Sequence, residues 1–161
     1  MPARHMPLVG IPTCLRKVNQ RLFHGVNARY PSAVIDAAGC LPILIPAVGS
    51  KIDICTVLNR LDGLLLTGSP SNVHPSHYGA EPSDAEILHD PERDATTLPL
   101  IREAVRRDLP HLGDMPRHPG VERGAWRYAA PAGSRVKSVD CWINAIGMQG
   151  SPVHCGWRSL Y

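Results

Sequence analysis

Residues 61–73 read LDGLLLTGSPSNV, and no other stretch says as much about the fold. An aspartate–glycine turn leads into three consecutive leucines, and Thr67 and Gly68 follow at once. A short, unbroken apolar run is typical of a strand that is buried on both faces of a parallel sheet. Glycine directly after such a strand permits a tight turn that leaves backbone N–H groups exposed. Such N–H groups can stabilise an oxyanion, although a plain turn between a strand and a helix has the same spacing.

The sequence on either side of this stretch alternates between strand-like and helix-like segments. Short apolar runs predict strands at residues 8–12, 41–46 and 64–66. Helical spacing of apolar residues predicts helices at residues 29–38, 50–59 and 93–107. Ser50 is the expected cap of the second helix, and Pro99 favours a later start for the third. This order predicts an α/β fold in which a parallel sheet is flanked by helices and binds ligands beyond the carboxyl ends of its strands.

Composition limits the class of protein and divides the chain near Pro110. The length of 161 residues suits one α/β domain, and no apolar run is long enough to span a bilayer. The first residues lack the apolar core of a signal peptide, so we expect a cytoplasmic protein. The net charge of +3 comes entirely from residues 111–161, which also hold all three tryptophans.

The cysteines indicate free thiols. The chain has five, none of them in a C-x-x-C pair, which in a reducing compartment is not the pattern of a disulfide framework. Cys14, Cys40 and Cys55 are expected to have structural roles, although Cys14 follows the first strand and lies nearest the functional edge of the sheet. Cys141, His154 and Cys155 match no zinc-site spacing, and no metal site is predicted.

Four motifs resemble the opening of the γ-glutamyl-γ-aminobutyrate hydrolases, which are class I glutamine-amidotransferase-like proteins of the peptidase C26 type. They are PLVGIPT at residues 7–13, AVIDAAG with LP at 33–42, LDGLLLTGSPSNV at 61–73 and DPERD at 90–94. The resemblance covers nearly all of residues 7–110. It implies the front half of a flavodoxin-like α/β domain. It also implies hydrolysis of γ-glutamyl amides by a Cys-His-Glu triad, with no metal or organic cofactor.

Five residues take roles from this resemblance. Gly68 and Ser69 correspond to the loop that forms the oxyanion hole of the family. Asn72, Tyr78 and Arg93 belong to segments that border the family's substrate cleft, and a structural role in pinning the loop is an equal alternative for these three. The expected partner of an intact family member is a small γ-glutamyl substrate, with no nucleic acid and no membrane. The oligomeric state is left open.

The nucleophile of the family is missing where it is expected, near Met115. The family continues with a fourth strand that ends in a cysteine at a sharp strand-to-helix turn, a setting that favours the thiolate. Residues 111–120 instead read HLGDMPRHPG, which predicts no apolar strand and contains no cysteine. The histidine and glutamate of the triad are missing as well. We therefore expect this chain to hydrolyse no γ-glutamyl substrate.

A change of reading frame near Pro110 accounts for the missing motif. When the codons are read one base late, Met115 followed by Pro116 must encode cysteine, and Trp126 must encode glycine. The sequence therefore predicts a partial α/β domain at residues 1–110. Residues 111–161 are predicted to be a largely disordered tail translated out of frame. Its origin is either a sequencing error or a pseudogene.

Two alternatives remain open. Residues 1–110 could act as a non-catalytic α/β binding module, although half of a parallel sheet exposes an unpaired edge that favours aggregation. The arginines of residues 117–135, with Trp126 and Tyr128 among them, could bind nucleic acid. Translation of a GC-rich gene out of frame yields the same enrichment in arginine and tryptophan.

Overall fold

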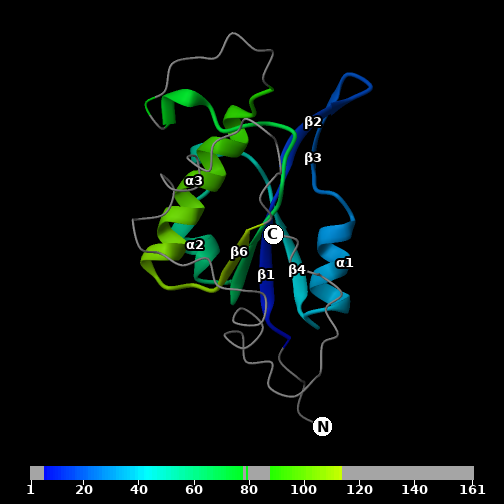
Figure 1. Ribbon diagram of the computed structural model, residues 1–161, viewed down its shortest axis with the longest axis vertical. Helices are drawn as coiled ribbons and strands as arrows, with labels where there is room; N and C mark the ends of the chain where they lie inside the picture. The colour runs from blue at the N-terminus through cyan, green and yellow to red at the C-terminus, as the bar shows by residue number, and fades with distance from the viewer. Residues whose placement is uncertain (1–5, 78, 80–87, 114–161) are drawn as a thin grey trace, which may run out of the picture.

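A computed structural model describes residues 6–77, 79 and 88–113 of the chain (Figure 1). The strands are β1 (Leu8–Pro12), β2 (Cys14–Val18), β3 (Arg21–Gly25), β4 (Leu41–Ile45), β5 (Gly63–Leu66) and β6 (His111–Gly113). The α-helices are α1 (Arg29–Asp36), α2 (Ile54–Leu58) and α3 (Pro91–Arg106), and two short 3-10 turns are η1 (Gly49–Lys51) and η2 (Pro75–His77). No helix in the described part of the chain is both long and apolar enough to cross a membrane.

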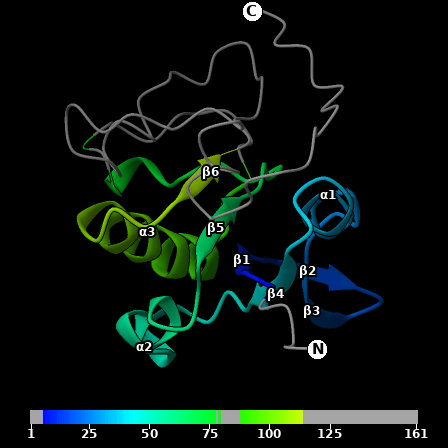
Figure 2. The ribbon, with the colours of Figure 1, turned by 90° about the horizontal axis from the view of Figure 1, so that it is seen from below.

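Four strands form a parallel sheet in the order β4-β1-β5-β6. Leu8 pairs with Leu41, Val9 with Gly63, and Leu64 with His111. Helix α1 covers one face of the sheet, and α2 and α3 lie on the other (Figure 2). The predicted α/β class, a parallel sheet with flanking helices, is confirmed.

The core lies in two layers because successive strand residues point to opposite faces of the sheet. Leu65 packs toward α1, in a cluster with Val9, Ile11, Tyr30 and Val34. Its neighbour Leu64 packs toward the other helices, in a cluster that comprises Ile45, Leu58, Leu61, Leu100 and Ala104. The leucine run thus supplies both layers, as expected of a strand that is buried on both faces.

The hairpin of β2 and β3 was not predicted. It is an antiparallel pair that extends from the end of β1, with Cys14 opposite Gly25 and Val18 opposite Arg21. Asn19 and Gln20 form its turn, and both have positive φ angles, 47° and 69°. Two-residue hairpin turns of this kind usually carry glycine at the second position, so Asn19-Gln20 is a weak signal in the sequence.

Two helices begin at positions other than those expected. Asp53, not Ser50, caps α2 by accepting the N–H of Thr56, and Ser50 lies in η1. Helix α3 begins at Pro91 and continues through Pro99 to Arg106 without a break. The predicted late start was wrong because Asp90 already caps the helix at the N–H of Arg93, and Pro91 suits the first turn.

A fourth parallel strand is present where the sequence predicted none. Residues 111–113 form β6 beside β5, and the N–H of Leu64 donates to the carbonyl of Pro110 at 2.9 Å. Backbone pairing of this kind does not require a run of apolar residues. Of the three residues of β6, Leu112 is the one that packs against the core on the α1 face. The expectation of disorder for the rest of the tail lies outside the described residues.

Candidate functional site

The carboxyl ends of β1 and β5 meet at one edge of the sheet, where the chain leaves β1 for the hairpin and β5 for residues 67–70 (Figure 1). This arrangement brings Cys14 to Ser69, although they are 55 positions apart, with 3.3 Å between Sγ and Oγ. Parallel strands place all their carboxyl ends on the same side, which is why residues that follow different strands converge here. Ligand binding was predicted from the sequence at this end of the sheet.

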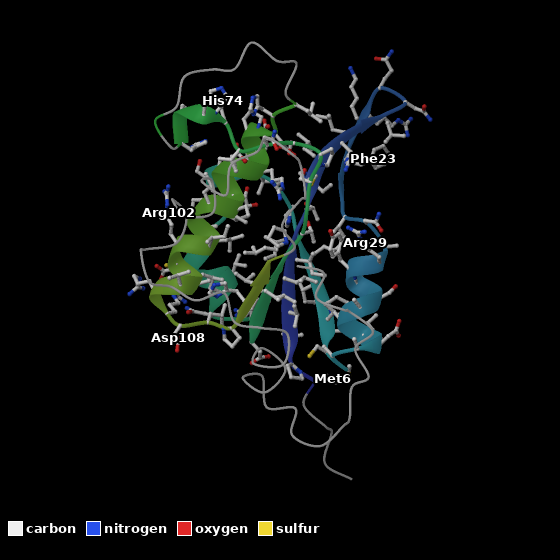
Figure 3. All side chains as sticks on the ribbon, in the orientation of Figure 1. Met6, Phe23, Arg29, His74, Arg102 and Asp108 are labelled. Atoms are coloured by element: carbon white, nitrogen blue, oxygen red, sulfur yellow. The ribbon has the colours of Figure 1, made fainter. Side chains whose placement is uncertain are left out.

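An open cleft of about 760 Å³ lies at this edge. The hairpin forms one wall, the start of α1 forms a second, and the loop after β5 forms a third. Its lining residues are Cys14, Arg16, Val18, Phe23, Gly25, Val26, Asn27, Arg29, Tyr30, Thr67, Gly68, Ser69 and Pro70. Figure 3 shows Phe23 on the hairpin and Arg29 near the start of α1, on the same side of the molecule.

Gly68 lies in the cleft, and its N–H group is engaged. It donates to the hydroxyl oxygen of Tyr30 at 3.2 Å, and Nη2 of Arg29 donates to the same oxygen at 2.8 Å. A polar oxygen therefore already occupies the place that a substrate oxygen would take beside this amide. This amide could stabilise a developing oxyanion only if that oxygen replaced the Tyr30 hydroxyl as its acceptor.

Ser69 also lines the cleft, and its side chain stabilises the loop. Its hydroxyl lies 2.8 Å from Oγ of Ser71 and accepts the N–H of Ser71 at 3.1 Å. A serine hydroxyl that accepts an N–H two residues ahead closes a small local turn. The side chain of Ser69 thus holds the loop, and through its contact with Sγ of Cys14 it ties the loop to the end of β1.

Arg93 lies behind the loop and is not among the residues that line the cleft. Its side chain is buried, and Nη2 donates to the carbonyl of Thr67 at 3.0 Å. Nε of Arg93 has no hydrogen-bond partner among the residues that the structure describes. Through this bond the helix α3 fixes the position at which the Gly68 loop starts.

Asn72 lies outside the cleft, where the backbone forms a parallel bridge with His89. Its N–H donates to the carbonyl of Leu88 at 2.9 Å, and its own carbonyl lies 3.0 Å from Nδ1 of His89. The described contacts of Asn72 are thus those of a loop anchor. Tyr78, and the position near Met115 where the nucleophile was expected, lie outside the described residues.

Two aspartates at the start of α3 anchor the segments around the cleft. Asp90 accepts the N–H of Leu15 at 2.8 Å in addition to that of Arg93. Asp94 accepts the N–H of His74 at 2.9 Å. Burial raises the pKa of Asp94 because it disfavours the charged carboxylate, and the hydrogen bond from His74 opposes this only in part. These carboxylates accept hydrogen bonds from backbone N–H groups and are not among the residues that line the cleft.

The thiols in the described residues have no basic partner in the cleft. No histidine is among the residues that line it, and no group of three or more potential metal ligands occurs in the part of the chain that the structure describes. Cys40 is buried, lies 3.2 Å from the carbonyl of Ala38, and has its pKa raised by burial. The described site can therefore bind and orient a small molecule, but it lacks a thiol that is activated by a base.

The sequence did not indicate the two arginines and the tyrosine that line the cleft. Arg16, Arg29 and Tyr30 enter it from β2 and from the start of α1. Because the hairpin was not predicted, nothing indicated that residue 16 would return to the sheet edge. Residues 14–18 read CLRKV, which has no regular alternation of apolar and polar residues, so the sequence gives no clear signal for this strand.

Comparison with known proteins assigns the family. Residues 7–114 match the family model described as Peptidase C26, and the chain belongs to this family. Among curated proteins, it is 35% identical over 105 residues to a γ-glutamyl-γ-aminobutyrate hydrolase of Escherichia coli O157:H7. That match covers 65% of this chain and 40% of the relative.

Two further relatives carry broader names. A putative glutamine amidotransferase-like protein of Rickettsia prowazekii (strain Madrid E) is 26% identical over 116 residues, which is 68% of this chain and 40% of the relative. A putative glutamine amidotransferase of Mycobacterium tuberculosis (strain ATCC 25618 / H37Rv) is 31% identical over 111 residues, 66% of this chain and 36% of the relative. The chain thus spans about 40% of the length of the curated relatives that it matches.

Proposed function

We propose that this chain carries the substrate-binding edge of a γ-glutamyl amide hydrolase but does not itself hydrolyse these substrates. The observation that supports the proposal most is the position of Gly68. Its N–H group faces a cleft at the carboxyl end of β5, in a segment that belongs to the Peptidase C26 family. A relative that is 35% identical to this chain is named a γ-glutamyl-γ-aminobutyrate hydrolase.

Amide hydrolysis of this type has three chemical requirements. A thiolate attacks the carbonyl carbon, backbone donors stabilise the oxyanion, and a histidine transfers the proton to the departing amine. Gly68 can supply a donor for the second requirement. Among the described residues, Cys14 is the thiol that lines the cleft with Gly68, and its described neighbour is the hydroxyl of Ser69, which is no base at neutral pH. Within the part of the chain that the structure describes, the first and third requirements are unmet, and we infer that turnover is absent.

The test is the release of glutamate from γ-glutamyl-γ-aminobutyrate by the purified chain and by its Cys14→Ala and Cys40→Ala variants. The proposal predicts no release above the buffer background from any of the three proteins. Turnover that disappears in Cys14→Ala would make Cys14 a nucleophile and contradict the proposal. Turnover that survives both substitutions would contradict it equally, because the reaction would then use a group outside this account.

A non-catalytic binding role is the second candidate, and the cleft itself favours it. The cleft presents charged, apolar and backbone donor groups without any contribution from the missing triad. A chain with this cleft can bind a γ-glutamyl compound without cleaving it, so binding and turnover must be measured separately.

A further inference from the structure

One face of the hairpin is turned toward the cleft. In an antiparallel pair, directly opposed residues point to the same face, and alternate residues point to opposite faces. Cys14, Arg16 and Val18 of β2 therefore share a face with Phe23 of β3, which is opposite Arg16. All four line the cleft, whereas Lys17, between Arg16 and Val18, points to the other face and does not.

The charged side chains that line the described part of the cleft are both positive. Arg16 and Arg29 line it, and no aspartate or glutamate does so among the residues that the structure describes. A planar guanidinium group matches the geometry of a carboxylate. Val18, Phe23 and Val26 add apolar side chains to the same lining. These groups together suit an organic acid with an aliphatic stem.

Tyr30 connects the charged part of the cleft to the amide donor. Its hydroxyl oxygen accepts from Nη2 of Arg29 at 2.8 Å and from the N–H of Gly68 at 3.2 Å. The guanidinium of Arg29 therefore lies one hydroxyl group away from the donor that would face a substrate carbonyl. This spacing suits a molecule whose amide carbonyl and carboxylate are separated by a short aliphatic chain.

We propose that Arg16 and Arg29 bind a free carboxylate of a small acid amide, and that the carbonyl of this amide replaces the Tyr30 hydroxyl as the acceptor of the Gly68 N–H. The proposal rests on the function proposed above for its substrate class, and on the cleft for its chemistry. A γ-glutamyl derivative of an amino acid has a carboxylate on each side of the amide bond, and the two share the chemistry that the arginines recognise. The arginines would then select acid amides over neutral ones.

Calorimetric titration of the full chain with γ-glutamyl-γ-aminobutyrate tests this site. Arg16→Gln and Arg29→Gln are each expected to weaken binding about tenfold, the low end for a charge-assisted hydrogen bond. Lys17→Gln is the matched control, because it removes the same charge from the same strand but on the opposite face. It is expected to bind like the unmodified chain. Circular dichroism of each variant establishes that the fold is retained.

Two analogues identify the carboxylate that is bound. γ-Glutamyl-propylamide lacks the carboxylate on the amine side, and N-butanoyl-γ-aminobutyrate lacks the one on the glutamyl side. If one analogue binds weakly and its binding is unchanged by Arg29→Gln, the carboxylate that it lacks is the one that the arginines bind. The proposal is supported whichever of the two analogues behaves in this way.

The proposal is overturned if the unmodified chain binds none of the three compounds at millimolar concentration. It is also overturned if the arginine variants bind as tightly as the unmodified chain, or if Lys17→Gln weakens binding as much as they do. These results are distinct from failure of the proposed function. Glutamate release by the chain would contradict the proposed lack of turnover and leave the carboxylate site intact.

Discussion

At the residue scale, the cleft is organised around the hydroxyl of Tyr30. The ring of this residue packs in the core beneath α1, and its hydroxyl joins Arg29 to Gly68. Gly68 and Ser69 could be placed near the site from sequence, because an apolar run followed by glycine marks the carboxyl end of a buried strand. Tyr30 could not, since its contact with Gly68 spans 38 positions and depends on how α1 packs.

Tyr30→Phe isolates the contribution of this hydroxyl. The substitution keeps the buried ring and removes the acceptor shared by Arg29 and Gly68. We expect the free energy of unfolding to fall by about 0.5–1.5 kcal/mol, the usual net value of a lost hydrogen bond. Urea denaturation followed by circular dichroism measures the change. A loss above about 3 kcal/mol would indicate that the ring had also shifted, so that the change in stability did not come from the hydroxyl alone.

At the element scale, the sequence predicted strands β1, β4 and β5 and the three α-helices. The strands that it missed depend on backbone geometry and pairing, which leave little trace in the sequence. The run at residues 64–66 and the apolar segment at 8–12 are buried on both faces, and hydrophobicity alone marks such strands. The hairpin turn at Asn19 and Gln20 depends on positive φ angles, which those residue types signal weakly. The short β6 depends on pairing with β5 and on a single leucine.

Asp90→Ala tests how the start of α3 supports the cleft. The carboxylate of Asp90 caps the helix at Arg93 and also accepts the N–H of Leu15, where β2 begins. Loss of both bonds is expected to lower the free energy of unfolding by about 2–4 kcal/mol. Asp36→Ala, at the exposed end of α1, is the control and should lie within about 0.5 kcal/mol of the unmodified chain. Equal effects of the two substitutions would contradict the role given to Asp90.

The last turn of α3 predicts a dependence of stability on acid pH. Hydrogen bonds from Arg106 and Arg107 lower the pKa of Glu103 from 4.5 to about 2. Because the folded pKa lies below the unfolded one, this contribution is complete above pH 4.5 and is lost as the pH falls toward about 2. Glu103→Gln should flatten that part of the stability curve, and solvent screening keeps the effect small. The measurement is the urea midpoint of the unmodified chain and of Glu103→Gln from pH 6 to pH 2. A parallel loss of stability in the two proteins would contradict the prediction.

At the scale of the whole molecule, the sheet has an exposed apolar edge at β4. Leu41, Ile43 and Leu44 are 45%, 41% and 48% exposed, and β4 pairs with β1 as the terminal strand of the described sheet. Pro42 suits such a position because proline is tolerated on edge strands. An exposed apolar edge strand is a template for association with another chain. Self-association of the purified chain is therefore expected through this edge.

Ile43→Lys should reduce that self-association. A lysine on the edge strand places a charge where a second strand would pair. Sedimentation velocity over a concentration series is expected to shift toward the monomer for this variant. Leu22→Lys is the matched control, since Leu22 is 65% exposed and lies on β3, which belongs to the separate two-stranded sheet. If the control dissociates the assembly as well as Ile43→Lys does, the contact is not made through β4.

The central claim for the whole molecule concerns the coding sequence beyond Pro110. The family match ends at residue 114, and the codons that follow encode cysteine in place of Met115 when they are read one base late. We propose that the cysteine nucleophile expected for this family is encoded in the adjacent frame, so that the cleft described above and the missing triad belong to one ancestral protein.

The most direct test measures glutamate release from γ-glutamyl-γ-aminobutyrate by the product of the gene after removal of one base near codon 110. The account predicts turnover by this product, none by the present chain, and loss of turnover when the newly encoded cysteine is replaced by serine. An early stop codon in the restored frame, or a folded product without activity, would contradict it.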